Sequence, residues 1–122
     1  MSFGVGVDLL TISRVKPMVK NKMEGFLQQF TFEEQVEAQK AIDQTIYYAE
    51  RFAAKEAVLK SLNFKIERGN FCEIQTLDND FGKPVVTLFG EVEQLFINRK
   101  LNQIDLSLSY EKGLVMAVAV VG

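Results

Sequence analysis

The segment Tyr-Tyr-Ala-Glu-Arg-Phe-Ala-Ala-Lys-Glu-Ala-Val-Leu-Lys-Ser-Leu, residues 47–62, decides how this chain folds. Its 16 residues include neither Gly nor Pro and are largely strong helix formers, so they predict one long helix. At about 100° per residue, one side of this helix carries Phe52 and Leu59, and another carries a strip of alanines. A helix with such a strip can approach a neighbouring element closely.

A strand, a broken amphipathic stretch and one helix are predicted before the long helix. Residues 3–12 alternate as a strand does, and residues 14–29 form an amphipathic stretch that is broken around Pro17. Thr31 and Glu34 have the spacing of a capping box, which predicts a helix from there to about residue 43.

Five elements are predicted after it. Residues 71–77 and 85–89 are typical of strands, with dense turn chemistry between them, and residues 90–99 suit a short helix. Two more strands, 104–109 and 114–121, are joined by a hairpin turn at 110–113. The order β-α-α-β-β-α-β-β predicts an α+β fold with helices packed on a largely antiparallel sheet. We expect a single domain over residues 1–122, because no linker or internal repeat interrupts the chain.

Composition excludes several classes of function. The 14 basic and 16 acidic residues give a net charge of −2, which argues against nucleic-acid binding through backbone phosphates. The absence of histidine excludes Ser-His-Asp triads and His-ligated zinc, and Mg²⁺ is the metal that the remaining inventory suits well. One cysteine, Cys72, cannot form an internal disulfide. Because neither a membrane-spanning run nor the pattern of a signal peptide is present, we expect a cytoplasmic protein without membrane partners.

Asp8 is the first candidate site residue. In the strand over residues 3–12 it shares a face with Gly4 and Gly6, while Phe3, Val5, Val7 and Leu9 share the other. The missing side chains of the two glycines let another backbone or a ligand approach closely and leave the carboxylate uncovered. The alternative is that Asp8 ends the strand and caps the next element.

Glu56 is the second candidate. It lies on the long helix between the apolar side and the alanine strip, where a carboxylate that is buried needs a cation or strong donors. Lys60, one turn later, supplies an ordinary partner of that kind. Arg51 and Lys55 lie on the opposite side of the helix, so charges ring it instead of forming one solvated face.

Two further candidates are a basic segment after the first strand and a pair of serines near the C-terminus. Four basic residues and no acid lie between residues 9 and 23, namely Arg14, Lys16, Lys20 and Lys22. This basic patch suits an acidic protein partner as well as it suits phosphates, and a solvated helix face is the alternative. Ser107 and Ser109 share one strand face, and since no histidine can activate them, we expect hydrogen bonding to a ligand or to the turn.

Three motifs in order resemble a known family. Gly4-Val5-Gly6-Val7-Asp8-Leu9, Arg51-Phe52-Ala53-Ala54-Lys55-Glu56-Ala57 and Ser107-Leu108-Ser109-Tyr110 resemble the holo-[acyl-carrier-protein] synthases, which are short 4′-phosphopantetheinyl transferases. Gly82-Lys83-Pro84 also matches a signature of that family. The resemblance covers residues 3–121 and implies the family's fold. It also implies transfer of the phosphopantetheine arm of coenzyme A to a serine of apo-acyl carrier protein, with release of adenosine 3′,5′-bisphosphate.

The resemblance also implies roles for single residues. Asp8 and Glu56 match the Mg²⁺ ligands of the family, Glu56 is the candidate for removing the serine proton, and Lys60 matches a lysine that acts at the phosphates. Coenzyme A would be bound by Arg51, Lys55, Lys83, Pro84, Ser109 and Tyr110. Arg14, Lys16, Lys20 and Lys22 would receive the acidic carrier protein, and the protein would be a homotrimer with active sites between subunits.

Two departures from the family pattern favour a different function. Tyr110 stands where the family usually has histidine, and a tyrosine cannot carry positive charge. After the long helix the chain reads Leu62-Asn63-Phe64-Lys65-Ile66 where the family tends to have Gly-Thr-Gly, and the next glycine is Gly69. The alternative is therefore a non-catalytic homologue that binds carrier protein or acts as a structural partner, while a third possibility is an unrelated α+β binding domain.

Overall fold

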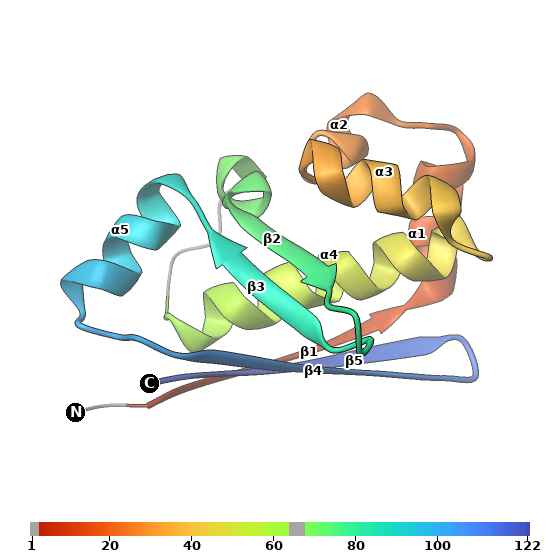
Figure 1. The fold of residues 1–122 in the computed structure, drawn as a ribbon. Coiled ribbons are helices and arrows are strands. Elements are labelled where there is room, and N and C mark those ends of the chain that lie inside the picture. The colour runs from red at the N-terminus through yellow and green to blue at the C-terminus, as the bar shows by residue number, and fades with distance from the viewer. Residues whose placement is uncertain (1–2, 64–67) are drawn as a thin grey trace.

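The computed structural model describes residues 3–63 and 68–122 and contains two antiparallel sheets (Figure 1). The three-stranded sheet has the order β1 (Gly4–Thr11), β5 (Leu114–Val121), β4 (Ile104–Glu111). The second sheet pairs β2 (Ile74–Asp78) with β3 (Pro84–Leu88). The predicted α+β fold with helices on antiparallel strands is confirmed, and the strands are divided between two sheets.

Helix α4 (Gln44–Ser61) is the long helix that the sequence predicts, and it lies along the three-stranded sheet (Figure 1). It begins three residues before the predicted start, because the Asp43 side chain accepts a hydrogen bond from the Ile46 amide at 3.1 Å and caps the first turn. The departure from the family pattern that the sequence shows after this helix lies in residues 62–69, of which residues 64–67 are outside the described part of the chain.

Two glycines of β1 let α4 approach this sheet closely. A Cβ atom on Gly4 would lie 1.8 Å from the Ser61 carbonyl oxygen, and one on Gly6 would lie 1.9 Å from that of Ala57. Real Cβ atoms do not approach oxygen so closely, so any larger residue would push the helix away. Of the two possibilities raised by the glycines, a backbone or a ligand, the structure therefore shows the backbone of α4.

Three shorter helices precede α4, namely α1 (Ile12–Lys20), α2 (Glu24–Leu27) and α3 (Phe32–Lys40). The predicted capping box is confirmed, since Thr31 Oγ1 accepts from the Glu34 amide at 3.2 Å and Glu34 Oε1 accepts from the Thr31 amide at 2.9 Å. The predicted break at Pro17 is wrong, because α1 continues through it and is capped by Asn21. Lys22, with φ 48°, then turns the chain in the left-handed region.

The C-terminal half matches the prediction with two shifts. Strand β2 begins three residues later than predicted, because the 3₁₀ helix η1 (Arg68–Glu73) occupies the start of that segment. Strand β4 continues through Tyr110 to Glu111, which leaves a two-residue turn of Lys112 and Gly113 with φ 51° and 77°. Positive φ at both positions is the geometry of a tight hairpin. Helix α5 (Gly90–Asn98) forms where it was predicted.

Within residues 3–63 and 68–122, no helix combines the length and the apolar character that crossing a membrane requires.

Candidate active site

Asp8, Glu56 and Lys60 come together where the middle of β1 faces α4. The Asp8 side chain lies on the glycine face of β1 and is 6% exposed. Lys60 Nζ donates to Asp8 Oδ1 at 3.1 Å and to the Val7 carbonyl oxygen at 3.2 Å. The carboxyl group of Glu56 lies close to that of Asp8. The close packing at Gly4 and Gly6 brings the helix near enough for these contacts, and we call the three residues the acidic cluster.

The acidic cluster has more negative charge than its lysine can neutralise. Burial first, and then the neighbouring Asp8 carboxylate, raise the pKa of Glu56 to about 7. The positive charges of Lys60 and Arg14 act against this rise. Asp8 Oδ2 is buried and has no hydrogen-bond partner among the described residues. The site therefore offers a buried carboxylate oxygen and a neighbouring carboxyl group to an additional cation.

Mg²⁺ fits this donor set. It binds oxygen ligands, and in phosphate-transferring proteins it is held by one or two carboxylates together with substrate phosphates and water. No group of three or more acidic or cysteine side chains that could enclose a metal occurs in the described parts of the chain. A pair of carboxylates of which one, Glu56, is only half-buried matches the partly solvated coordination of Mg²⁺ better than a site closed by protein alone.

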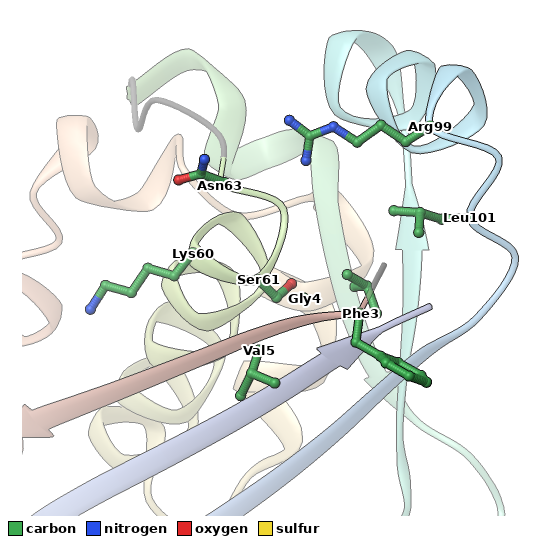
Figure 2. A pocket seen from close by; sticks show the side chains of 9 residues that line it. Phe3, Gly4, Val5, Lys60, Ser61, Asn63, Arg99 and Leu101 are labelled. Carbon is green, nitrogen blue, oxygen red and sulfur yellow. The ribbon is translucent and has the colours of Figure 1, made fainter. Parts of the chain in front are cut away.

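A cavity of about 590 Å³ lies beside Lys60 at the C-terminal end of α4 (Figure 2). Its walls include residues from the ends of β1 and α4 and from the segment after α5, among them Phe3, Lys60, Ser61, Asn63, Arg99 and Leu101. Arg99 and Leu101 were not predicted as site residues. No local signal marks them, because only the packing of the α5 end against the α4 end brings them to this cavity.

Arg51 and Lys55 lie away from the acidic cluster. Arg51 is 2% exposed, and its Nη2 donates to Asp78 Oδ2 at 3.0 Å, while its guanidinium stacks over the Tyr47 ring at 4.4 Å from the ring centre. Lys55 is fully buried and donates to Glu34 Oε1 at 2.7 Å, to the Phe71 carbonyl oxygen at 3.0 Å and to that of Ile74. The structure thus does not bring either cation together with Asp8, and it gives both of them protein partners.

Lys55 and Glu34 form a buried ion pair that links three elements. Glu34 Oε2 accepts from the Thr76 amide of β2 at 2.8 Å, so one carboxylate joins the start of α3, the middle of α4 and β2. Burial lowers the pKa of Lys55, and the charge and hydrogen bond of Glu34 oppose that shift. This ion pair fixes how α4 packs against the rest of the fold. Because Lys55 immediately precedes Glu56 in the chain, it also fixes the part of α4 that carries Glu56.

The other four residues predicted to bind coenzyme A lie on strand ends. Lys83 is exposed with its Nζ 4.0 Å from Asp105 Oδ1, and Pro84 begins β3 opposite Asp78. Ser109 and Tyr110 are exposed on β4, opposite Met116 and Val115. Among the described residues, no hydrogen bond connects these four side chains to the acidic cluster.

The four residues of the basic patch are exposed on and just after α1. Arg14 is near enough to Glu56 to lower its pKa, which puts one end of the patch at the acidic cluster. In the parts of the chain that the structure describes, Arg14, Lys16, Lys20 and Lys22 form no ion pair with an acidic side chain. The patch is therefore a set of cations without internal partners beside an acidic site.

The outer face of the three-stranded sheet is apolar and exposed. The side chains on this face in and just before β1 are largely exposed, at 76% for Phe3, 61% for Val5 and 56% for Leu9. The cross-strand register places Met116 of β5 beside Leu9 and Val120 beside Val5. The glycine face of β1 is the covered one, so the large side chains of this strand point away from α4. A contiguous apolar face of this kind marks a surface that another molecule covers.

Comparisons with known proteins agree with this architecture. The family model described as the 4′-phosphopantetheinyl transferase superfamily matches residues 4–119. A holo-[acyl-carrier-protein] synthase of Magnetococcus marinus is 40% identical over 129 aligned positions, which cover 99% of this chain and 93% of the relative. The crystal structure of a holo-[acyl-carrier-protein] synthase from Neisseria meningitidis superposes with a TM-score of 0.87 at 29% identity, covering 98% of this chain and 97% of that one. A synthase from Helicobacter pylori, solved in complex with coenzyme A, gives a TM-score of 0.82 at 28% identity, covering 97% of this chain and 99% of that one.

Proposed function

The chain belongs to the 4′-phosphopantetheinyl transferase superfamily, and on that premise we propose that its acidic cluster transfers the phosphopantetheine arm of coenzyme A to acyl carrier protein. It is a transferase of the holo-[acyl-carrier-protein] synthase type. The observation that carries the residue assignment is the meeting of Asp8, Glu56 and Lys60, three residues from two distant motifs, at one partly open place.

Asp8 and Glu56 would hold Mg²⁺. The support is the unpartnered buried Asp8 Oδ2 and the carboxyl group of Glu56 next to it, which together make a site short of positive charge. A bound Mg²⁺ supplies positive charge that offsets the negative charge developing on the pyrophosphate of coenzyme A. Lys60 adds a second positive charge at the same place, and its partial exposure leaves it free to contact a phosphate oxygen.

The transfer breaks a phosphoanhydride bond of coenzyme A and forms a phosphate ester on the carrier serine. The serine oxygen of the carrier protein forms a new bond to the β-phosphorus, and the bond from that phosphorus to the bridging oxygen breaks. Adenosine 3′,5′-bisphosphate leaves with the electron pair of the broken bond. Glu56 is our candidate for the group that takes the serine proton, because it is a carboxyl group at this site and an ionised carboxylate can accept a proton.

The basic patch is the docking surface for the carrier protein. Its four cations have no acidic partners within the described residues, they are exposed, and Arg14 connects them to the acidic cluster. An acidic carrier would neutralise them and would place its serine at the Arg14 end of the patch.

Arg51 and Lys55 of α4 were also expected to bind coenzyme A. Both are better explained as structural cations, because both are buried in ion pairs.

The protein forms a homotrimer through the outer face of the three-stranded sheet. The apolar residues of β1 and β5 on that face give a surface whose burial would stabilise an assembly. In such a trimer, Lys83, Pro84, Ser109 and Tyr110 of one subunit would complete the site of a neighbour, which accounts for their separation from the acidic cluster within one chain.

Intact-mass spectrometry tests the proposed function directly. Apo-acyl carrier protein is incubated with this protein, coenzyme A and Mg²⁺, and a parallel sample contains a chelator. The expected result is a mass gain equal to one phosphopantetheine, lost in the chelator sample. No gain with several apo carriers, from protein shown to be folded by circular dichroism, would favour a non-catalytic homologue that only binds carrier protein.

A further inference from the structure

Lys60 reaches the acidic cluster from the last turn of α4. Its side chain points away from Arg99 and Leu101 on the other side of the neighbouring cavity (Figure 2). Nζ donates to Asp8 Oδ1 at 3.1 Å and to the Val7 carbonyl oxygen at 3.2 Å, so two oxygens of β1 hold it. The lysine side chain is 45% exposed, whereas Asp8 is buried. The ammonium group can therefore leave Asp8 for another anion at small cost, while the carboxylate stays in place.

Lys60 and a metal ion would share the carboxylate of Asp8. Lys60 bonds to Oδ1, and Oδ2 is the buried oxygen that has no partner among the described residues. Both oxygens belong to the same carbon atom, so a divalent cation on Oδ2 is a near neighbour of the ammonium group on Oδ1. Like charges at such short range in a partly buried site repel each other. Lys60 at Asp8 therefore weakens the binding of Mg²⁺ to the same carboxylate.

The charges of the acidic cluster indicate what relieves this repulsion. Asp8 and Glu56 are two acids that face one lysine, so the cluster has one net negative charge when both are ionised. A divalent cation alone would turn this into a net positive charge, which a pyrophosphate group would offset. Phosphate oxygens accept hydrogen bonds from an ammonium group and also bind Mg²⁺. The pyrophosphate of coenzyme A can thus draw Lys60 away from Asp8.

We propose that Lys60 couples the binding of Mg²⁺ to the binding of coenzyme A. The inference rests on the proposed function and adds a role for a residue of the same site. Without coenzyme A, Lys60 stays on Asp8 and keeps the affinity for Mg²⁺ low. When the coenzyme binds, its pyrophosphate takes the ammonium group and leaves Asp8 to the metal. Because such coupling is reciprocal, Mg²⁺ also strengthens the binding of the coenzyme by the same factor.

Calorimetric titration with magnesium chloride tests this coupling without turnover, because no carrier protein is present. The measured quantity is the dissociation constant of Mg²⁺ at about pH 8, where carboxylates are ionised. Without coenzyme A, Lys60→Met should bind Mg²⁺ at least about threefold more tightly than wild type, because the competing charge is gone. Lys60→Arg keeps the charge and should keep the wild-type affinity. Lys40→Met is the matched control and should also keep it, because Lys40 is an exposed lysine that pairs with Glu37 and not with the acidic cluster.

The same titration with saturating coenzyme A measures the coupling itself. In wild type, the coenzyme should tighten the binding of Mg²⁺ about tenfold or more. In Lys60→Met the gain should be smaller, because no ammonium group remains to be drawn from Asp8. Lys60→Gln also removes the charge and gives the same test if circular dichroism shows that Lys60→Met is unfolded.

The outcomes separate this inference from the proposed function. Phosphopantetheine transfer by wild type, together with equal or weaker Mg²⁺ binding by folded Lys60→Met, would overturn the coupling role alone. Lys60 would then only orient Asp8. An equal gain from coenzyme A in wild type and Lys60→Met would overturn it as well. Absence of both transfer and Mg²⁺ binding in wild type would contradict the proposed function, and the coupling role with it.

Discussion

Helix α4 carries two lysine–carboxylate pairs that differ in how completely they are satisfied. Lys55 and Glu34 are fully buried, and between them they bond to four backbone groups as well as to each other. Lys60 and Asp8 form the second pair, in which Lys60 is 45% exposed, Asp8 Oδ2 has no partner among the described residues and a second carboxyl group lies alongside.

The difference separates a structural ion pair from a functional one. A buried pair stabilises a fold only when every charge and donor has a partner, as at Glu34. A pair that keeps an unpartnered oxygen and an excess acid, as at Asp8, loses stability that only an additional ligand can restore. Residue types alone do not distinguish the two, because each pair consists of a lysine of α4 and a carboxylate from another element.

The largest expected effect comes from removing either carboxylate of the acidic cluster. Asp8→Ala and Glu56→Ala should each lower the transfer rate at least about a thousandfold, equivalent to about 4 kcal/mol. Folding should change little, because each substitution relieves repulsion between the two acids. Intact-mass assays measure the transfer, and urea unfolding measures the free energy of unfolding. Retained activity in both variants would refute the metal assignment.

The structural pair should respond in the opposite way. Lys55→Met leaves the buried Glu34 carboxylate without its cation and should cost about 3–4 kcal/mol in the free energy of unfolding. The transfer rate per folded molecule should stay within about threefold of wild type, since the loss falls on folding and not on a group at the site. A variant of normal stability that binds coenzyme A poorly would show instead that Lys55 contacts the coenzyme, as the family resemblance implies.

A third arrangement is an exposed cation with no partner at all. Lys20 on α1 has no acidic partner among the described residues, whereas Lys40 on α3 is paired with Glu37 at 2.9 Å. Lys20→Glu should raise the KM for carrier protein by roughly threefold to tenfold, with the KM for coenzyme A unchanged. Lys40→Glu is the control and should leave both constants unchanged. Equal effects of Lys20→Glu on the two substrates would mean that the basic patch is not the docking surface.

Much of this comparison could be predicted from the sequence, and part of it could not. The long helix and the capping box at Thr31 follow from local propensity, whereas the meeting of Asp8 with Glu56 was implied only by the family resemblance. The contrast between Lys55 and Lys60 could not be predicted from the sequence, because it depends on which face of α4 the rest of the chain covers. The break expected at Pro17 was wrong because the helix tolerates one missing amide and ends where Asn21 and Lys22 turn the chain.

The cavity beside Lys60 was the other feature beyond the reach of sequence analysis. Arg99 is separated from Lys60 by the whole β2–β3 hairpin and α5, and its position is set by how α5 packs and where its last turn ends. The exposed apolar face of β1 was visible as alternation, but the alternation alone did not say which face the helix would cover. The close approach at Gly6 decides that, because a side chain larger than hydrogen cannot fit there.

The smallest expected effect is the pH dependence that distinguishes the two pairs in metal-free protein. Glu56 has its pKa raised from 4.5 to about 7 in the folded state, so between these values the folded protein holds a proton that the unfolded chain has released. The stability that this proton contributes is complete below pH 4.5 and is lost as the pH rises through about 7. Thermal unfolding in the presence of a chelator should therefore show a decline in Tm over this window that is absent in Glu56→Gln. The decline should be modest, because solvent screens a half-buried group.

Glu111→Gln, at the exposed end of β4, is the control and should keep the wild-type profile. Addition of Mg²⁺ should reduce the decline, because a cation that binds the ionised carboxylates stabilises the folded protein more as the pH rises. A Glu56→Gln profile identical to that of wild type would show that Asp8 and Glu56 do not share their charge, and the contrast with the Lys55–Glu34 pair would then rest on burial alone.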